Sequence, residues 1–277
     1  MKLFIRAHDL GVKGEENIIN QLDELGLSGV QLVAYKCLDD VAYAPGAITT
    51  QRAEAFSAAF KNAGKTVPLI GAYFNPVHPN EEKVKNGIAV FKDYLAHCHE
   101  LSCEVVGSET GSYNGDKWTY HPQNRTEEAL SCVINTFSEL ADYAKSRNAF
   151  IGMEGAFGHV CWNVKTLDRA VKAIGRDNIR IIFDLYNYLD RSNVAEMYDI
   201  LHEGLETFGG NIQVFHIKDC VIAEDGTLKQ VGVGKGIFDY SRIIPEIKKV
   251  CPDANLVFEG TTGEDIPAAV AHIKQFI

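Results

Sequence analysis

Four ionisable residues in the second half of the chain each come directly after a bulky apolar residue that ends a short apolar run. A buried ionised group without a partner is destabilising, because nothing replaces its lost hydration. Carboxylates that meet at one place also repel one another, and a divalent cation relieves both problems. Three oxygens and one nitrogen suit Mn²⁺, Mg²⁺ or Co²⁺, and Zn²⁺ also accepts them. The sequence therefore predicts one divalent metal ion held by Glu154, Asp184, His216 and Glu259.

These side chains meet only if the elements that carry them converge. Short apolar runs rich in Val and Ile alternate with longer stretches of helical spacing, and eight such repeats in 277 residues predict an α/β protein, a single-domain (β/α)8 TIM barrel over residues 1–277. An open doubly wound sheet is the alternative, but no GxGxxG follows the first run. In a barrel, the active site lies at the carboxyl ends of the strands. The eight runs are residues 3–5, 29–33, 67–70, 105–106, 150–153, 179–183, 212–215 and 256–258.

Several of the intervening stretches carry clear helix signals. Ile18, Leu22 and Leu25 lie on one helical face, and Gly26 follows them as a C-cap. The other helices that the spacing delimits cover residues 51–62, 125–146 and 268–277.

Further polar side chains follow other predicted strands and indicate a substrate pocket at the same end of the barrel. Lys218 lies two residues beyond His216 and shares its face, so it is predicted to contact a substrate oxygen, with an ion pair to Asp219 as the alternative. His8 is predicted to contact the substrate, with a hydrogen-bonded structural role as the alternative. The segment 73–79 is predicted to line the sugar pocket, and because its prolines make it stiff, a rigid connector is the alternative. The other predicted substrate-binding residues are His8, Tyr73, Asn75 and Glu109.

Two other features leave their roles open. The glycine-rich segment 232–236 lacks Walker spacing, which argues against a nucleotide site. It is either a turn that leads into the next helix or a cradle for a sugar phosphate in which Lys235 takes part. Trp118 and Trp162 suit either an apolar wall over a sugar ring or core packing.

The composition, 46% hydrophobic and 23% charged, is typical of a soluble globular protein. A net charge of −10 disfavours nucleic acid as a partner. No apolar run reaches the roughly 18 residues that span a bilayer, and the first residues do not resemble a signal peptide. The seven cysteines are scattered and form no CxxC, which is typical of a reducing compartment. We therefore expect a cytoplasmic protein that does not bind membranes.

Five segments resemble the xylose-isomerase-like superfamily of sugar isomerases and epimerases: residues 153–155, 183–187, 215–219, 231–240 and 257–260. The resemblance implies that Glu154, Asp184, His216 and Glu259 hold the metal, and that Glu154 and Glu259 act as acid and base on opposite faces of the substrate. It also implies a homo-oligomer. Asn187 stands where the ketose 3-epimerases carry a substrate-contacting histidine, so we expect it in a substrate-facing shell that differs from theirs.

Such a site suits removal of a proton next to a carbonyl, through an enediolate, in a sugar or related polyol. Returning the proton gives isomerisation or epimerisation, which is the leading prediction. Loss of a hydroxyl instead gives a lyase for an inosose-like or dehydroshikimate-like substrate. A sugar-binding barrel without chemistry is the non-enzyme alternative. An endonuclease-IV-like hydrolase is disfavoured, because the chain is acidic, has Asn187 at an expected ligand position and lacks an Asp-x-His before residue 231.

Overall fold

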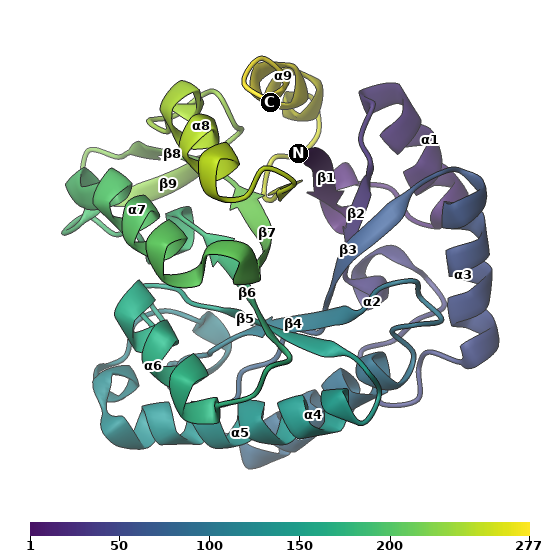
Figure 1. Ribbon diagram of the computed structural model, residues 1–277, viewed down its shortest axis with the longest axis horizontal. Coiled ribbons are helices and arrows are strands. Elements are labelled where there is room, and N and C mark those ends of the chain that lie inside the picture. The colour runs from purple at the N-terminus through teal and green to yellow at the C-terminus, as the bar shows by residue number, and fades with distance from the viewer.

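The computed structural model describes all residues from Met1 to Ile277 and contains a closed barrel of eight parallel strands surrounded by helices (Figure 1). This confirms the predicted (β/α)8 barrel, and each predicted run is one of its strands. The first and last strands close the barrel by pairing with each other. In their order around the barrel the strands are β1 (Lys2–Arg6), β10 (Asn255–Phe258), β7 (Ile212–Ile217), β6 (Ile179–Asp184), β5 (Phe150–Glu154), β4 (Val105–Glu109), β3 (Thr66–Gly71) and β2 (Gly29–Leu32).

The predicted helix boundaries hold to within a few residues. Gly26 ends the first helix in the left-handed conformation, with φ of 62°, and its N–H donates to the Leu22 and Asp23 carbonyls. The last helix starts earlier than predicted and ends before the final residues. No helix is both long and apolar enough to cross a bilayer. The helices are α1 (Glu15–Leu25), α2 (Ala34–Cys37), α3 (Thr50–Asn62), α4 (Glu81–Ala96), α5 (Glu127–Lys145), α6 (Val164–Ile174), α7 (Met197–Phe208), α8 (Tyr240–Val250) and α9 (Asp265–Lys274), and short 3-10 helices cover residues 7–10, 115–117, 122–125, 186–188, 194–196 and 209–211.

Apolar side chains pack on both sides of the barrel wall. A cluster of 72 buried residues lies between the strands and the helices. A second cluster takes one side chain from each of six strands, which places it inside the barrel. Gly107 leaves room for it, since a Cβ there would lie 2.5 Å from Cδ1 of Ile182. The barrel is therefore a filled core, and its open end is at the polar strand termini. The inner cluster consists of Phe4, Leu69, Val105, Ile182, Val214 and Val257.

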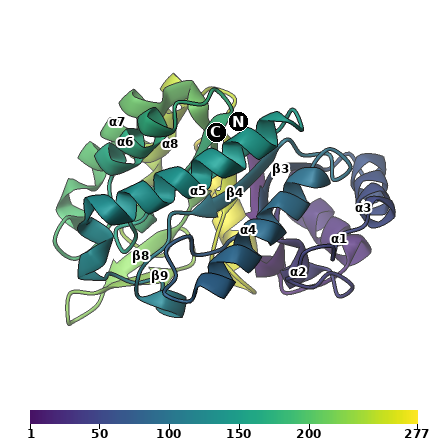
Figure 2. The ribbon, with the colours of Figure 1, turned by 90° about the horizontal axis from the view of Figure 1, so that it is seen from below.

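A small hairpin follows β7 and is not part of the barrel. Strand β8 (Asp219–Ile222) pairs antiparallel with β9 (Leu228–Val231), and Figure 2 shows the two standing out beside the barrel. These strands are not predicted from the sequence. Lys229 and Gln230 in β9 are exposed, so the segment has no continuous apolar run.

Candidate active site

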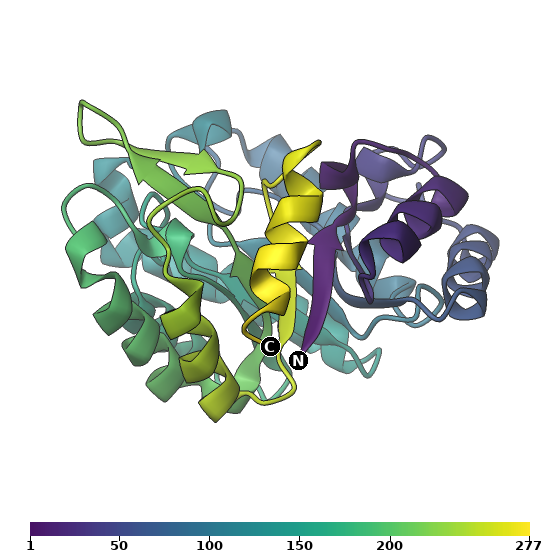
Figure 3. The same cartoon turned by 90° about the horizontal axis from the view of Figure 1, so that it is seen from above.

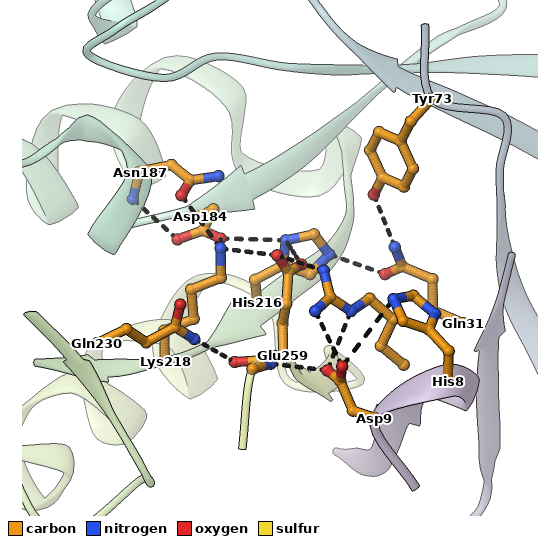
Figure 4. Close-up of polar contacts among 12 residues, drawn as sticks. His8, Asp9, Gln31, Tyr73, Asp184, Asn187, His216, Lys218, Gln230 and Glu259 are labelled. Carbon is orange, nitrogen blue, oxygen red and sulfur yellow. Dashed lines mark hydrogen bonds and ion pairs between the residues drawn. The ribbon is translucent and has the colours of Figure 1, made fainter. Parts of the chain in front are cut away.

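The four predicted metal ligands lie at the carboxyl ends of four adjacent strands. Glu154 ends β5, Asp184 ends β6, His216 is the penultimate residue of β7, and Glu259 directly follows β10. The barrel order places these strands side by side, and Asp184 is in register with His216. Figure 4 shows the side chains of Asp184, His216 and Glu259 pointing toward one another. The convergence follows from each group ending its own strand.

The imidazole of His216 faces one oxygen of each carboxylate. Its Nδ1 lies 3.4 Å from Glu154 Oε1, 3.2 Å from Asp184 Oδ2 and 3.0 Å from Glu259 Oε2. Ligands that bind one ion at about 2.1 Å stand roughly 3 Å apart, so this spacing fits a shared cation. One oxygen each of Glu154 and Asp184 and a nitrogen of His216 lie within 4.8 Å of one another, so these three residues could hold a metal ion. The fourth predicted ligand, Glu259, contacts the group through Nδ1 of His216 but is not part of it.

Gln31 in β2 determines which nitrogen of His216 faces the carboxylates. The amide of Gln31 donates from Nε2 to the Tyr73 hydroxyl at 2.7 Å, so its Oε1 points to His216 Nε2 at 2.8 Å. Nε2 therefore carries a proton, and Nδ1 is the nitrogen that faces the carboxylates. As the imidazolium, His216 donates from Nδ1 to Asp184; once it loses that proton, Nδ1 would offer its lone pair to a metal. Burial lowers the pKa of His216, but the charges of Glu259 and Glu154 raise it well above its usual value.

Lys218 contacts the carboxylates rather than the cavity. Its Nζ donates to Asp184 Oδ2 at 2.8 Å, to Glu259 Oε1 at 2.7 Å and to Asn187 Oδ1 at 3.1 Å, which uses all of its N–H groups. Burial lowers the pKa of Lys218, but Asp184 and Glu259 raise it above its ordinary value, so the ammonium stays charged. Lys218 therefore offsets one of the carboxylate charges at the site.

Asn187 links the carboxylates to one another. Its Nδ2 donates to Glu154 Oε1 at 2.7 Å, and its backbone N–H donates to Asp184 Oδ1 at 3.0 Å. Its side-chain amide therefore has protein partners at both ends, Glu154 at the nitrogen and Lys218 at the oxygen. Neither Asn187 nor Lys218 lines the cavity above the site.

Arg6 and Asp9 also belong to the site and are not among the residues predicted from the sequence. The Arg6 guanidinium lies 2.9 Å from Glu259 Oε1 and pairs with both oxygens of Asp9. Asp9 in turn accepts a hydrogen bond of 2.7 Å from the N–H of Gly260. Arg6 ends β1 as the ligands end their strands, so the same strand-end criterion identifies it.

The two glutamates have opposite pKa shifts. Burial raises the pKa of Glu154 to about 7, although the nearby His216 opposes the rise. Burial also raises the pKa of Glu259, but Lys218 and His216 outweigh it, and the result lies well below the ordinary value. The pair thus contains one carboxylate that is held ionised and one that titrates near neutrality.

A cavity of about 790 Å³ opens above these carboxylates. Burial, with a contribution from Glu259, raises the pKa of Glu109 to about 7. Nδ1 of His8 is buried without a hydrogen-bond partner. The amide of Asn75 is fully used, because it donates to Ser112 O and Gly115 O and accepts from two backbone N–H groups. Of the predicted site residues, His8, Tyr73, Asn75, Glu109, Glu154 and Glu259 line this cavity, and so does Trp118.

The family model for the xylose isomerase-like TIM barrel matches residues 19–276. The chain belongs to that family. No curated protein matches the chain.

Solved structures with this xylose isomerase-like barrel cover nearly the whole chain. The IolI protein with a bound zinc atom has a TM-score of 0.75 at 15% identity, over 100% of this chain and 96% of that one. The 3-keto-D-glucoside 4-epimerase YcjR from E. coli has a TM-score of 0.73 at 16% identity, over 99% of each chain. A xylose isomerase-like TIM barrel protein from Mycobacterium smegmatis in complex with magnesium has a TM-score of 0.74 at 14% identity, over 100% of this chain and 95% of that one. At these identities the likeness establishes the shared fold.

In this xylose isomerase-like chain, the glycine-rich segment is a turn that encloses Asp219. The buried carboxylate accepts hydrogen bonds from the N–H groups of Gly234, Gly236 and Phe238. A Cβ at Gly236 would lie 2.2 Å from Asp219 Oδ1, which explains the glycine. Lys235 pairs with Asp265 outside this turn. The donors of a phosphate cradle are therefore already satisfied by a side chain of the protein.

Proposed function

We propose that the protein is a divalent-metal-dependent isomerase or epimerase of a sugar or related polyol. One observation supports this most strongly: His216 Nδ1 faces three carboxylate oxygens at 3.0–3.4 Å, next to a large cavity. The names of the similar structures agree with the proposal, since one is a 3-keto-D-glucoside 4-epimerase and others contain zinc or magnesium.

Glu154, Asp184, His216 and Glu259 would hold the ion. When bound, a divalent metal polarises the carbonyl and hydroxyl oxygens of a substrate and so acidifies the neighbouring C–H. Zn²⁺, Mg²⁺, Mn²⁺ and Co²⁺ all accept this ligand set.

Glu154 and Glu259 both line the cavity and are the candidates for acid and base. A group that titrates near neutrality exchanges protons most effectively, and the pKa of Glu154 is about 7. Lys218 and Arg6 hold Glu259 as a carboxylate and lower its basicity, so Glu154 is the stronger base of the two. Because the two residues come from separate strands, β5 and the end of β10, they can serve different faces of a bound substrate.

The test combines metal analysis with solvent isotope exchange. Purified protein is assayed for bound metal and incubated in D₂O with a panel of ketoses and cyclic ketols. Glu154→Gln and Glu259→Gln should each lower the rate of deuterium entry by at least about a hundredfold, the scale of general acid–base catalysis. Entry of deuterium without loss of water supports the isomerase or epimerase, and a new conjugated absorbance would indicate a dehydratase instead. Ligand binding with no exchange in the unmodified protein would leave a sugar-binding barrel.

A further inference from the structure

The cavity is larger than one sugar ring needs. A hexose has about twelve non-hydrogen atoms, which fill at most about 360 Å³ if each takes the roughly 30 Å³ of a water molecule in the liquid. The cavity measures about 790 Å³. Its inner part is lined by Glu154 and Glu259. Its outer part is lined by the start of α4 and by the loop between β4 and α5, which lie side by side (Figure 2). The outer part is therefore free for a second group.

Trp118 lines the outer part on a strained backbone. Its φ is 54°, a left-handed conformation that bulky side chains rarely adopt. Buried His159 compensates, because its Nε2 donates to the Trp118 carbonyl at 3.1 Å and its ring lies 5.5 Å from the indole. Ser112 holds the next residue through a hydrogen bond from its hydroxyl to the Thr119 carbonyl. The backbone that carries the indole is thus held by hydrogen bonds at two successive carbonyls, and the indole packs beside the His159 ring.

The whole loop that carries Trp118 is preformed. Asn75, from the loop after β3, donates to Ser112 O at 2.7 Å and to Gly115 O at 3.0 Å. Asn114 donates to the Thr119 hydroxyl at 2.6 Å. These bonds order the loop before any ligand arrives, which lowers the entropy lost on binding.

A second aromatic residue, Tyr43, lines the same cavity from the loop after α2. It is 36% exposed, yet it is also fixed: its hydroxyl donates to the Tyr73 carbonyl at 3.1 Å, and its ring meets that of Tyr35 edge-on at 4.9 Å. Exposed aromatic faces held in place offer apolar surface with a polar edge, which suits the C–H faces of a sugar ring.

The charges near Trp118 in the outer part are paired within the protein. Lys83 lies 2.6 Å from Asp116, and His78 lies 3.2 Å from the same carboxylate. Lys36 forms no ion pair in the structure, and its ammonium lies 5.9 Å from the centre of the Tyr35 ring, on the Tyr43 side of the cavity. The wall around Trp118, where Lys83 and His78 are paired with Asp116, therefore offers no free cation to a phosphate.

We propose that the substrate is a glycoside, with its keto-sugar unit at Glu154 and Glu259 and a second, uncharged ring at Trp118 and Tyr43. The position of the first unit rests on the proposed function. The position of the second rests on the cavity and its fixed aromatic residues.

The test compares matched ligands by isothermal titration calorimetry on the full-length protein. D-fructose is set against its glucosyl and galactosyl derivatives isomaltulose and lactulose, and against D-fructose 6-phosphate. We expect the better disaccharide to bind at least about tenfold more tightly than D-fructose. Trp118→Ala should reduce that advantage by about three- to tenfold and leave the affinity for D-fructose unchanged, and Trp118→Phe should retain most of it. Tyr120→Ala is the matched control, since Tyr120 lies in the same loop, is 51% exposed and does not line the cavity.

The proposal is overturned if neither disaccharide binds, if D-fructose binds equally well, if the 6-phosphate binds more tightly than both disaccharides, or if Trp118→Ala weakens all sugars alike. Binding is measured without turnover. Disaccharide binding that depends on Trp118, with no isotope exchange, would therefore refute only the proposed function. Exchange into free ketoses with no gain from a second ring would refute only the glycoside.

Discussion

The orientation of His216 depends on a single amide, that of Gln31. Gln31 is fully buried and hydrogen-bonded at both ends, to His216 and to Tyr73. The partner of a metal-binding histidine fixes the ring and its tautomer, and losing such a partner typically weakens metal binding by about ten- to a hundredfold.

We therefore predict that Gln31→Leu lowers the affinity for Zn²⁺ by about ten- to a hundredfold, as measured by competition with a chelator. Gln213→Leu is the control, because Gln213 also lies in a barrel strand but donates to Pro68 O, away from the site. Equal affinities in the two variants would show that Gln31 does not orient the ligand.

His159 should make stability depend on pH. Burial lowers its pKa to about 4, which Glu154 and the Trp118 carbonyl only partly oppose. Below about pH 6.5 the unfolded chain binds a proton at this histidine, whereas the folded chain does so only near pH 4. The free energy of unfolding therefore falls as the pH drops from 6.5 to 4, and this group contributes about 3 kcal/mol to the fall. His159→Gln keeps an N–H donor for Trp118 and removes the titration. In urea unfolding at pH 6.5 and 4.5, the variant should lose less stability than the natural protein; equal losses would exclude His159 as the cause.

Helix α7 packs closely on β6 because Gly204 leaves room for the ring of Phe183. A Cβ at Gly204 would lie 2.1 Å from the ring of Phe183, the residue before Asp184. That ring cannot move aside easily, because it also packs against Tyr188 and Phe215. Alanine is the better helix former by about 1 kcal/mol, but the clash outweighs this gain.

Gly204→Ala should therefore destabilise the protein by about 1–3 kcal/mol in urea unfolding, against the intrinsic helix preference. Gly210→Ala is the control, since nothing lies within 4 Å of a Cβ there. Greater stability of Gly204→Ala would mean that Phe183 has room to shift.

Strand-level prediction worked where an element has a continuous apolar run, and it missed elements without one. The β8–β9 hairpin pairs locally and is half exposed, so its residues carry no buried-strand pattern. The role of the glycine-rich segment depends on Asp219, which lies more than a dozen residues earlier and is buried only in the folded chain.

For the whole molecule, the sequence predicts the barrel from eight alternating strand and helix segments, and it predicts the convergence of Glu154, Asp184, His216 and Glu259 from their places at strand ends. What it could not predict is which neighbours those side chains would find. Asn187 and Lys218 contact carboxylates instead of the cavity, Arg6 reaches Glu259 from the far end of the chain, and Trp118 adopts a left-handed backbone. Each of these contacts joins segments whose distance in space is set by the closed barrel.

The site spans the junction between β1 and β10, where the barrel closes and the two ends of the chain lie together (Figure 3). Glu259 and Gly260 follow β10, the barrel strand that is made last, and they contact Arg6 and Asp9, which end and follow β1, the barrel strand that is made first. A growing chain on the ribosome therefore carries Glu154, Asp184 and His216 for some time without their fourth partner. Completion of this polar cluster is thus a late event of biosynthesis, and a nascent chain that stalls before β10 leaves the cluster without Glu259.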